Sequence, residues 1–351
     1  MLRRILISAS IAFAMIIIAA TESSAVLPQR TFVASNGSDS NPCSITTPCR
    51  GFTTALAHTA SGGEIIVLDS AGYGPVTITQ PVSIIAPPGV YAGVAVFSGD
   101  GITINAPGGN VVLRGLSING LGGNAGINIT SATSVQLDNI IVSNMGAQGV
   151  VTSNSGTLVI SDSVFRHNAG DGISQQAGSL TLERVRSEGN EGRGLYAPTG
   201  ATASIDSSSF QQNFGEGIRV EDGGKVSVRA SVISGNQSDG IFVNAFNSGA
   251  VTIVELDNCM IDANSNNGIE AHASGVALTY VSVTGGHVNY NGSRGIYPTS
   301  LTATILLSGV TTFGYFGIDV DYSVGMIHSF GNNSVFSSGG SPPNLSISGL
   351  F

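Results

Sequence analysis

Short runs of alternating apolar and polar residues recur along the chain, each followed by a segment rich in Asn, Gly and Ser. The clearest form is HNAGDGI at 167–173. Variants of it return at 189–195, 212–218, 235–241, 263–269 and 290–296. Alternation predicts β-strands, and a unit of about 23 residues is too small to bury a core alone. The pattern therefore predicts a repeat protein made of short strands.

The repeat can be counted from the Gly that precedes the apolar residue. Nine such positions run from Gly126 to Gly317, at intervals of 22 to 28 residues. Leucine-rich repeats need Leu at fixed sites, whereas Ile and Val dominate here, and the G-G-x-G-x-D motif of calcium-binding nonapeptide repeats is absent. The remaining interpretation is an all-β, single-stranded parallel β-helix, a solenoid in which each unit of about 22–23 residues forms one coil.

The recurrent Asn is expected to occupy the same inward-facing turn in every coil. Adjacent strands lie about 4.8 Å apart, so each side-chain amide can donate a hydrogen bond to the next coil's amide. We expect the Gly four residues later to adopt a backbone conformation that a Cβ would hinder. A structural ladder is preferred over a ligand-binding role for these residues, which are Asn168, Asn190, Asn213, Asn236, Asn264 and Asn291.

Composition and charge agree with a folded β-protein and exclude some partners. The chain of 351 residues has 48 Gly, no Trp, 10% charged residues and 42% hydrophobic residues, whereas disorder needs low hydrophobicity and high charge. The net charge of −9 disfavours nucleic acid and anionic membranes as partners.

The first residues have the features of a secretory signal peptide. Two arginines, an apolar run and Ser-Ser-Ala predict a signal peptide at 1–25, and the alternative is an uncleaved membrane anchor. Cleavage would leave no membrane span. An N-terminal segment is then expected at 26–63 and the parallel β-helix at 64–351. Export to the periplasm or the extracellular space makes disulfides possible.

The three cysteines have different expected roles. Cys43 and Cys49 bracket a short Pro-containing loop, and we expect a disulfide between them rather than a zinc site. Cys259 falls at an inward repeat position, where a buried inert thiol is expected. The segment PCRGFTTALAHTA after the first Cys predicts a short amphipathic helix that covers the apolar end of the solenoid.

The segments TFVASNGSDSNPC and TPCRGFTTALAHTASGGEIIVLDS resemble the N-terminal signature of secreted right-handed β-helix proteins with the pectin-lyase-like fold. In that family a V-x-x-x-G-S-D-x-N-P segment leads to a capping helix, a Gly-rich turn and the first strand. The resemblance covers essentially the whole mature chain. It implies a right-handed β-helix and leaves the activity open, because the family includes lyases, hydrolases, epimerases and tailspikes. The Cys pair departs from the usual form of the signature and suggests an exported subgroup.

Alternation after each Gly–apolar pair places polar and aromatic residues on one outward face. The first outward column is expected to contain Ser174, Tyr196, Arg219, Phe242, Glu270, Tyr297 and Asp319, and the second to include Glu221, His272 and Asp321. Rings flanked by carboxylates suit a sugar chain, because apolar sugar faces stack on rings. Longer repeats at 244–250 and 272–277 are expected to wall this face. Tyr196, Phe242 and Tyr297 are therefore candidate substrate-binding residues.

The same face also carries groups that could catalyse a reaction. A lyase would use Arg219 to neutralise a substrate carboxylate and Glu221, Glu270 or His272 as the base. A hydrolase would use two carboxyl groups, Glu270 and Asp319. No cofactor is expected, and calcium at Asp319 and Asp321 is the metal considered for this face.

Three functions follow from this face. The favoured prediction is an exported protein that binds a polysaccharide or cell-surface glycan without proven catalysis. The alternatives are a polysaccharide lyase or glycoside hydrolase, and a structural surface rod whose charged columns are only stacked ion pairs. The family that the chain resembles includes calcium-dependent lyases, which use dense sets of Asp, Lys and Arg. Binding is favoured because no single coil of this chain contains such a set. The sequence indicates no oligomeric state.

Overall fold

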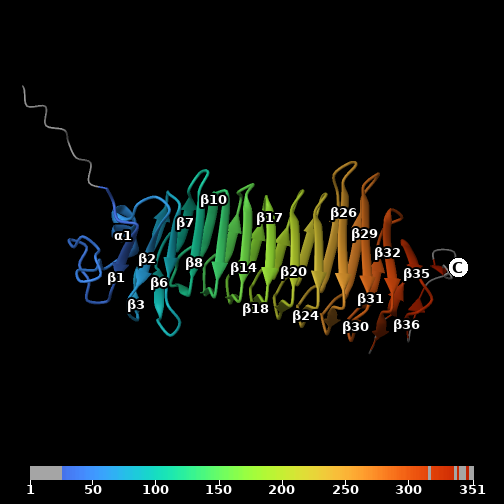
Figure 1. Cartoon of the computed structure of the whole chain (residues 1–351). Coiled ribbons are helices and arrows are strands. Elements are labelled where there is room, and N and C mark those ends of the chain that lie inside the picture. Colours follow the sequence, from blue (N-terminus) through green and yellow to red (C-terminus); the bar gives the residue numbers. More distant parts are fainter. Residues whose placement is uncertain (1–25, 315–317, 336–337, 340–344, 348–351) are drawn as a thin grey trace, which may run out of the picture.

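The coils of the chain stack along one axis into a rod, as the computed structural model in Figure 1 shows. It describes residues 26–314, 318–335, 338–339 and 345–347, so the expected signal peptide at 1–25 and Gly317 lie outside the described residues. The rod has about 11 turns, and all its strand pairs are parallel. This confirms the predicted all-β parallel β-helix.

Three parallel sheets form the sides of the rod, and we name them sheets A, B and C. Each complete coil passes through sheet C, then sheet A, then sheet B, before it rises to the next coil. Neighbouring coils pair residue for residue: Val135 faces Leu158 in sheet A, Val142 faces Phe165 in sheet B, and Ile127 faces Val150 in sheet C. The repeat interval read from the sequence is therefore the length of one coil.

Sheet A has 14 strands among the described residues. They are β1 (Arg30–Val33), β2 (Gly63–Val67), β5 (Val82–Ile85), β8 (Asn110–Arg114), β11 (Ser134–Asp138), β14 (Thr157–Ser161), β17 (Ser179–Glu183), β20 (Thr202–Asp206), β23 (Lys225–Arg229), β26 (Val251–Asp257), β29 (Leu278–Thr284), β32 (Ala303–Ser308), β35 (Met326–Ser329) and β38 (Leu345–Ile347).

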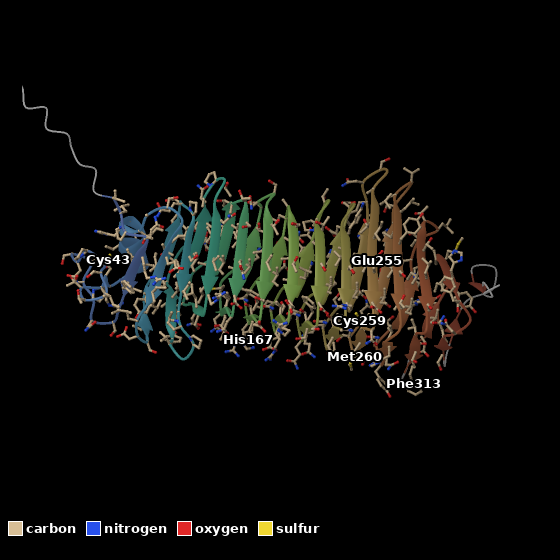
Figure 2. The ribbon with its side chains drawn as sticks, in the orientation of Figure 1. Cys43, His167, Glu255, Cys259, Met260 and Phe313 are labelled. Carbon is tan, nitrogen blue, oxygen red and sulfur yellow. A yellow bond between two sulfur atoms is a disulfide. The ribbon has the colours of Figure 1, made fainter. Side chains whose placement is uncertain are left out.

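Sheet B has 12 strands within the same ranges. They are β3 (Ala71–Gly72), β6 (Ala92–Val96), β9 (Leu116–Gly120), β12 (Ile141–Ser143), β15 (Val164–Arg166), β18 (Arg186–Glu188), β21 (Ser209–Gln211), β24 (Val232–Ser234), β27 (Met260–Asp262), β30 (His287–Asn289), β33 (Thr311–Phe313) and β36 (Ser334–Val335). Figure 2 shows His167, Met260 and Phe313 along this side of the rod.

Sheet C also has 12 strands in the part of the chain that the structure describes. They are β4 (Val76–Ile78), β7 (Ile102–Asn105), β10 (Ile127–Ser131), β13 (Val150–Thr152), β16 (Ile173–Gln175), β19 (Leu195–Ala197), β22 (Ile218–Glu221), β25 (Ile241–Ala245), β28 (Ile269–Ala273), β31 (Arg294–Pro298), β34 (Ile318–Asp321) and β37 (Ser338–Gly339).

A short helix, α1 (Phe52–His58), lies at the N-terminal end of the rod (Figure 1). It buries Phe52, Ala55 and Leu56 in the same apolar core as the first coils, which removes their apolar surface from water. Strand β1 precedes α1 and pairs in parallel with β2. The segment expected to precede the β-helix therefore supplies the first strand of sheet A.

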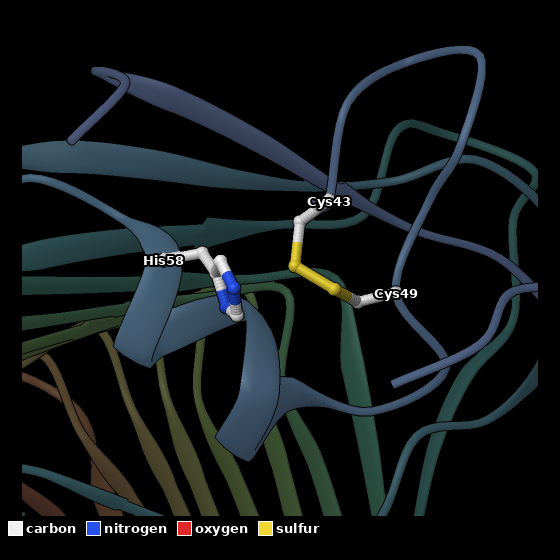
Figure 3. A group of neighbouring side chains, drawn as sticks. All are labelled: Cys43, Cys49 and His58. Atoms are coloured by element: carbon white, nitrogen blue, oxygen red, sulfur yellow. A yellow bond between two sulfur atoms is a disulfide. The ribbon is translucent and has the colours of Figure 1, made fainter. Parts of the chain in front are cut away.

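A disulfide joins Cys43 and Cys49 beside α1 (Figure 3). Both cysteines are buried, and the backbone around them pairs with β1: Phe32 donates a hydrogen bond to the carbonyl of Cys43, and Cys49 donates one to the carbonyl of Phe32. The remaining thiol, Cys259, is also buried, and burial raises its pKa. Such a thiol is a poor nucleophile because its reactive thiolate is disfavoured.

Six buried Asn side chains form a ladder along the turn between sheets B and C. The amide nitrogen of Asn190 donates to the amide oxygen of Asn213 at 2.9 Å, and that of Asn213 donates to Asn236 at 3.0 Å. The same oxygens also accept the backbone N–H of the preceding coil's Asn, at 3.1 Å and 3.0 Å. The ladder continues in both directions through Asn168, Asn264 and Asn291. Each buried amide thus has the partners that it needs.

The Gly four residues after each ladder Asn is required because there is no space for a side chain at that position. We expected it to permit an unusual backbone conformation, but Gly194, Gly217 and Gly240 do not have a positive φ. A Cβ on Gly217 would instead lie 2.7 Å from the carbonyl oxygen of Gly240 and 2.4 Å from a methyl group of Ile233. The coils approach each other so closely here that only a hydrogen atom fits.

Candidate functional site

The outward residues of sheet C form a continuous band of charged and aromatic side chains. We call it the sheet C strip and define it by Asp171, Arg193, Tyr196, Glu216, Arg219, Glu221, Asp239, Phe242, Asn267, Glu270, His272, Arg294, Tyr297 and Asp321. Strands β16 to β31 position it, because their residues pair in strict register. The first column is Ser174, Tyr196, Arg219, Phe242, Glu270 and Tyr297 in successive coils.

Each ring of the strip is contacted by an arginine. The guanidinium carbon lies 4.4 Å from the ring centroid for Arg193 over Tyr196, 4.8 Å for Arg219 over Phe242, and 4.0 Å for Arg294 over Tyr297. These distances are those of cation–π contacts. The contact with an arginine fixes the orientation of each ring. All three aromatic residues nevertheless remain partly exposed to solvent.

Two of these arginines are held by a chain of buried carboxylates. Arg193 lies 3.1 Å from Glu216 and 3.6 Å from Asp171. Arg219 bridges Glu216 at 3.0 Å and Glu221 at 2.6 Å. The hydroxyl of Tyr196 donates to Glu221 at 2.8 Å, and burial together with this hydrogen bond raises the pKa of Tyr196. The centre of the strip is therefore one connected polar network.

Asp239 is a buried carboxyl group whose environment disfavours its charged form. Burial raises its pKa to about 6, and the negative charges of Glu270 and Glu216 act in the same direction. Its oxygen accepts hydrogen bonds from the side chain of Asn266 and the backbone of Asn267, both at 2.8 Å. Burial likewise raises the pKa of Glu270, which Asn267 contacts at 2.6 Å. A carboxyl group whose pKa is raised toward neutral pH is typical of general acids.

His272 lies at the edge of the strip in the second column, where it pairs with Asn244 of the preceding coil. Its ring nitrogens lie 2.9 Å from the hydroxyl of Thr299 and 3.3 Å from that of Ser274. The side-chain oxygen of Asn244 is buried and has no hydrogen-bond partner in the structure. The long loops expected beside this face follow β25 and β28, and Ala245, Ala273 and Ala277 pack together beneath them.

The expected position of Asp319 in the first column is wrong by two residues. Strand β34 pairs Ile296 with Val320, so Asp321 takes the place beside Tyr297, and Asp319 faces Gly295. Both Asp319 and Asp321 are buried, and Asp321 contacts Arg294 at 2.6 Å. Burial acts to raise the pKa of Asp321, but hydrogen bonds from Ser323 and Arg294 outweigh it and the pKa lies below its usual value. The last repeat therefore differs in register from the earlier ones.

The residues that precede each Gly lie outside the two columns that the sequence offered as the candidate site. The structure brings Asp171, Arg193, Glu216, Asp239 and Arg294 against the first outward column. A usable feature was present in the sequence, because the position before the Gly is polar or charged in every unit from Gln148 to Arg294. What the sequence could not show is that its side chains lean across the neighbouring coil.

Sheet A carries a second polar face with shallow depressions. One depression is lined by Thr181, Leu182, Glu183, Ser204, Ile205, Asp206, Ser227 and Arg229. Arg229 and Asp206 form an exposed ion pair across it at 2.6 Å. Exposed pairs of this kind contribute little free energy, so this face fits a solvated surface better than a built site.

Within the described ranges, one group of three residues with metal-ligating atoms comes together, namely Cys43, Cys49 and His58. The sulfur atoms are joined in the disulfide, so they supply no thiolate, and the Nδ1 atom of His58 lies 2.9 Å from the carbonyl of Thr54 (Figure 3). The calcium site considered at Asp319 and Asp321 is opposed by the ion pair of Asp321 with Arg294.

Among the described residues, α1 has only seven residues, and no helix reaches the length and apolar content of a membrane span.

Comparison with solved structures and with sequence families identifies the fold family. Comparison with curated protein sequences gave no match. Among solved structures, the A-module of mannuronan C-5 epimerase AlgE6 from Azotobacter vinelandii is similar, with 18% identity, 90% of both chains covered and a TM-score of 0.52. A variant of the periplasmic alginate epimerase AlgG has 13% identity, covers 82% of this chain and 76% of its own, and gives a TM-score of 0.55.

A third similar structure, the pectate lyase Pel9A, has 16% identity, covers 91% of this chain and 78% of its own, and gives a TM-score of 0.50. At these identities the likeness concerns the fold, and the similar proteins are polysaccharide lyases and epimerases by name. The sequence family described as right handed beta helix region matches at residues 91–199, 125–279 and 174–340, which together span most of the chain. The chain therefore belongs to the right-handed β-helix family.

Proposed function

We propose that the protein is exported and binds a polysaccharide along the sheet C strip. The observation that carries the proposal is the spacing of the rings. Tyr196 and Phe242 stand two coils apart in one register column, and so do Phe242 and Tyr297. At about 4.8 Å per coil this spacing is about 9.6 Å, close to the repeat of a disaccharide in an extended chain. A polymer could then lie along the rod axis and contact each ring.

Two further observations support this proposal. The structurally similar proteins named above act on polysaccharides by name, which gives the fold a precedent for this class of partner. The disulfide between Cys43 and Cys49 fits an oxidising compartment, in keeping with the signal peptide that the sequence predicts. The periplasm and the extracellular space are both compatible with it.

The rings give the direct test. A variant with Tyr196→Ala, Phe242→Ala and Tyr297→Ala should lose binding to the polymer that the parent retains in affinity electrophoresis, by at least about tenfold. The matched control replaces Tyr91, Phe97 and Tyr280, three exposed aromatic residues outside the strip, by Ala. The control should bind as the parent does. Unchanged binding by the strip variant, or equal losses in both variants, would show that the strip is not the site.

A second candidate function, glycoside hydrolysis, is favoured by the carboxyl groups of the strip. Asp239 has a pKa of about 6 and could donate a proton to a leaving group. Glu221, paired with Arg219 at 2.6 Å, could act as the second carboxylate. A lyase is less well supported, because Arg219, the cation that it would use, already contacts Glu216 and Glu221.

Hydrolysis is tested with Asp239→Asn. On a polymer that the parent cleaves, release of reducing sugar should fall at least about a hundredfold while binding is retained. Cleavage at the parent's rate by Asp239→Asn would exclude this residue as the acid. A parent that binds the polymer and releases no sugar would leave binding as the function.

A further inference from the structure

The sheet C strip contains more carboxylates than cations. Its three cations are Arg193, Arg219 and Arg294, whereas its carboxylates number six: Asp171, Glu216, Glu221, Asp239, Glu270 and Asp321. The only lysine of the chain, Lys225, lies on β23 in sheet A. With every group ionised, the strip carries a net charge of −3, because six negative charges face three positive ones.

The three cations are also engaged by the protein itself. Arg219 directs Nε and Nη2 at Glu221 and Nη1 at Glu216, so three of its nitrogen atoms face protein carboxylates. Arg193 lies between Glu216 and Asp171, and Arg294 contacts Asp321 at 2.6 Å. Each guanidinium in addition covers an aromatic ring. A carboxylate of a ligand would have to compete with these internal partners.

The excess negative charge lies where solvent screens it poorly. Asp239 is buried, Glu270 is partly buried, and the charge of Glu270 raises the free energy of the charged form of Asp239. The strip's cations in the flanking coils, Arg219 and Arg294, are paired with other carboxylates. Carboxylate oxygens in such a place accept hydrogen bonds from hydroxyl groups and repel further anions.

We infer that the strip selects a neutral, hydroxyl-rich polysaccharide and rejects polyuronates. The inference rests on the proposed function and adds the chemical class of the polymer. Sugar hydroxyls can donate to the partly exposed carboxylate of Glu270, and the partly exposed rings can contact apolar sugar faces. A polyuronate would bring a carboxylate on each residue against the same surface. This specificity differs from that of the similar proteins, whose names refer to mannuronan, alginate and pectate.

The test compares polymers of matched size on the full mature chain. Neutral xylan, mixed-linkage glucan and galactomannan are set against alginate and polygalacturonate in affinity electrophoresis, at low salt and with a chelator present. At least one neutral polymer should bind at least about tenfold more tightly than either polyuronate. Low salt is chosen because it makes the repulsion between charges strongest.

A pair of charge variants distinguishes the effect of the strip's own charge from the effect of the chain's net charge of −9. The strip variant carries Glu216→Gln, Asp239→Asn and Glu270→Gln. The control carries Glu183→Gln, Glu255→Gln and Asp257→Asn on sheet A, which changes the net charge by the same amount; Figure 2 marks Glu255. The strip variant should gain at least about tenfold in binding to alginate, and the control should not. Equal gains in both variants would overturn the inference, because the overall charge would then explain the rejection.

The remaining outcomes separate the two proposals. Tighter binding of a polyuronate than of every neutral polymer would overturn the inference and leave polysaccharide binding at the strip standing. Polyuronate binding that equals or exceeds the binding of every neutral polymer once calcium replaces the chelator would also overturn it, because the strip would then not reject polyuronates. Binding of none of the five polymers would count against the proposed function, and the inference would fall with it.

Discussion

The guanidinium of Arg219 covers the ring of Phe242 at 4.8 Å, although 23 positions separate the two residues in the chain. They are register partners on β22 and β25, so a contact between coils fixes both side chains. The same guanidinium bridges Glu216 and Glu221. Arg219 therefore joins the aromatic and the acidic parts of the strip.

Replacing Arg219 by Ala should lower the free energy of unfolding by about 2 kcal/mol. The change leaves the buried carboxylate of Glu221 without its cation and removes one of the two cations of Glu216, and breaking a buried pair costs more than losing an exposed one. Arg186→Ala is the matched control, because Arg186 contacts Glu188 with its own side chain 58% exposed, and it should cost less than about 1 kcal/mol. Urea unfolding followed by circular dichroism gives both values. Equal losses in the two variants would contradict the network described here.

The Asn ladder should be sensitive to a single apolar replacement. Asn213→Leu removes the acceptor for two hydrogen bonds from Asn190 and the donor to Asn236, and we expect a loss of about 3 kcal/mol or more. Gln211→Leu, two residues earlier on a partly exposed site, should change the stability by less than about 1 kcal/mol. Thermal melts of the two variants measure the difference. A melting temperature of Asn213→Leu equal to the parent's would mean that the ladder adds nothing to stability.

Steric exclusion at the repeat Gly predicts a large effect from one methyl group. Gly217→Ala would place a Cβ 2.4 Å from Ile233 and 2.7 Å from the carbonyl of Gly240, and it should destabilise the rod by about 2 kcal/mol or more. Gly72→Ala is the control, because its Cβ would have its nearest contact at 3.9 Å. That variant should stay within about 0.5 kcal/mol of the parent in the same unfolding experiment. Similar stability of the two variants would refute the explanation by close approach.

The buried carboxyl group of Asp239 should make stability depend on pH. Its pKa is about 6 in the folded chain and 3.8 without burial, so between these values the folded chain binds more protons than the unfolded chain. The contribution of Asp239 to the free energy of unfolding therefore falls as the pH rises from about 4 to 6, by about 3 kcal/mol in total.

Asp239→Asn should remove this contribution, because the amide keeps an oxygen that can accept from Asn266 and Asn267. We expect the variant to be more stable than the parent at about pH 7.5 and no more stable near pH 4. Asp257→Asn, at an exposed site on sheet A, should follow the parent at both pH values. A stability difference between Asp239→Asn and the parent that does not change with pH would contradict the assignment.

Much of the fold could be predicted because its physical causes are local and repeated. Alternation within β-strands and a unit of about 23 residues predicted the parallel β-helix, which is confirmed. The cause of the repeat Gly was misjudged, since the space beside Gly217 is set by the next coil and not by its own φ. The strip was predicted only in part, because contacts such as Arg193 over Tyr196 depend on how side chains lean. Asp319 was misplaced because β34 shifts its pairing by two residues.

The residue-for-residue pairing of the coils makes the length of the rod adjustable in whole units. Deleting residues 195–217 would join Gly194 to Ile218, place Asn190 beside Asn236, and shorten the rod by about 4.8 Å. Duplicating the same stretch would lengthen it by that amount, with each new surface matching an existing one. Gene rearrangements can thus alter the length of the sheet C strip in fixed increments, without any new core having to evolve.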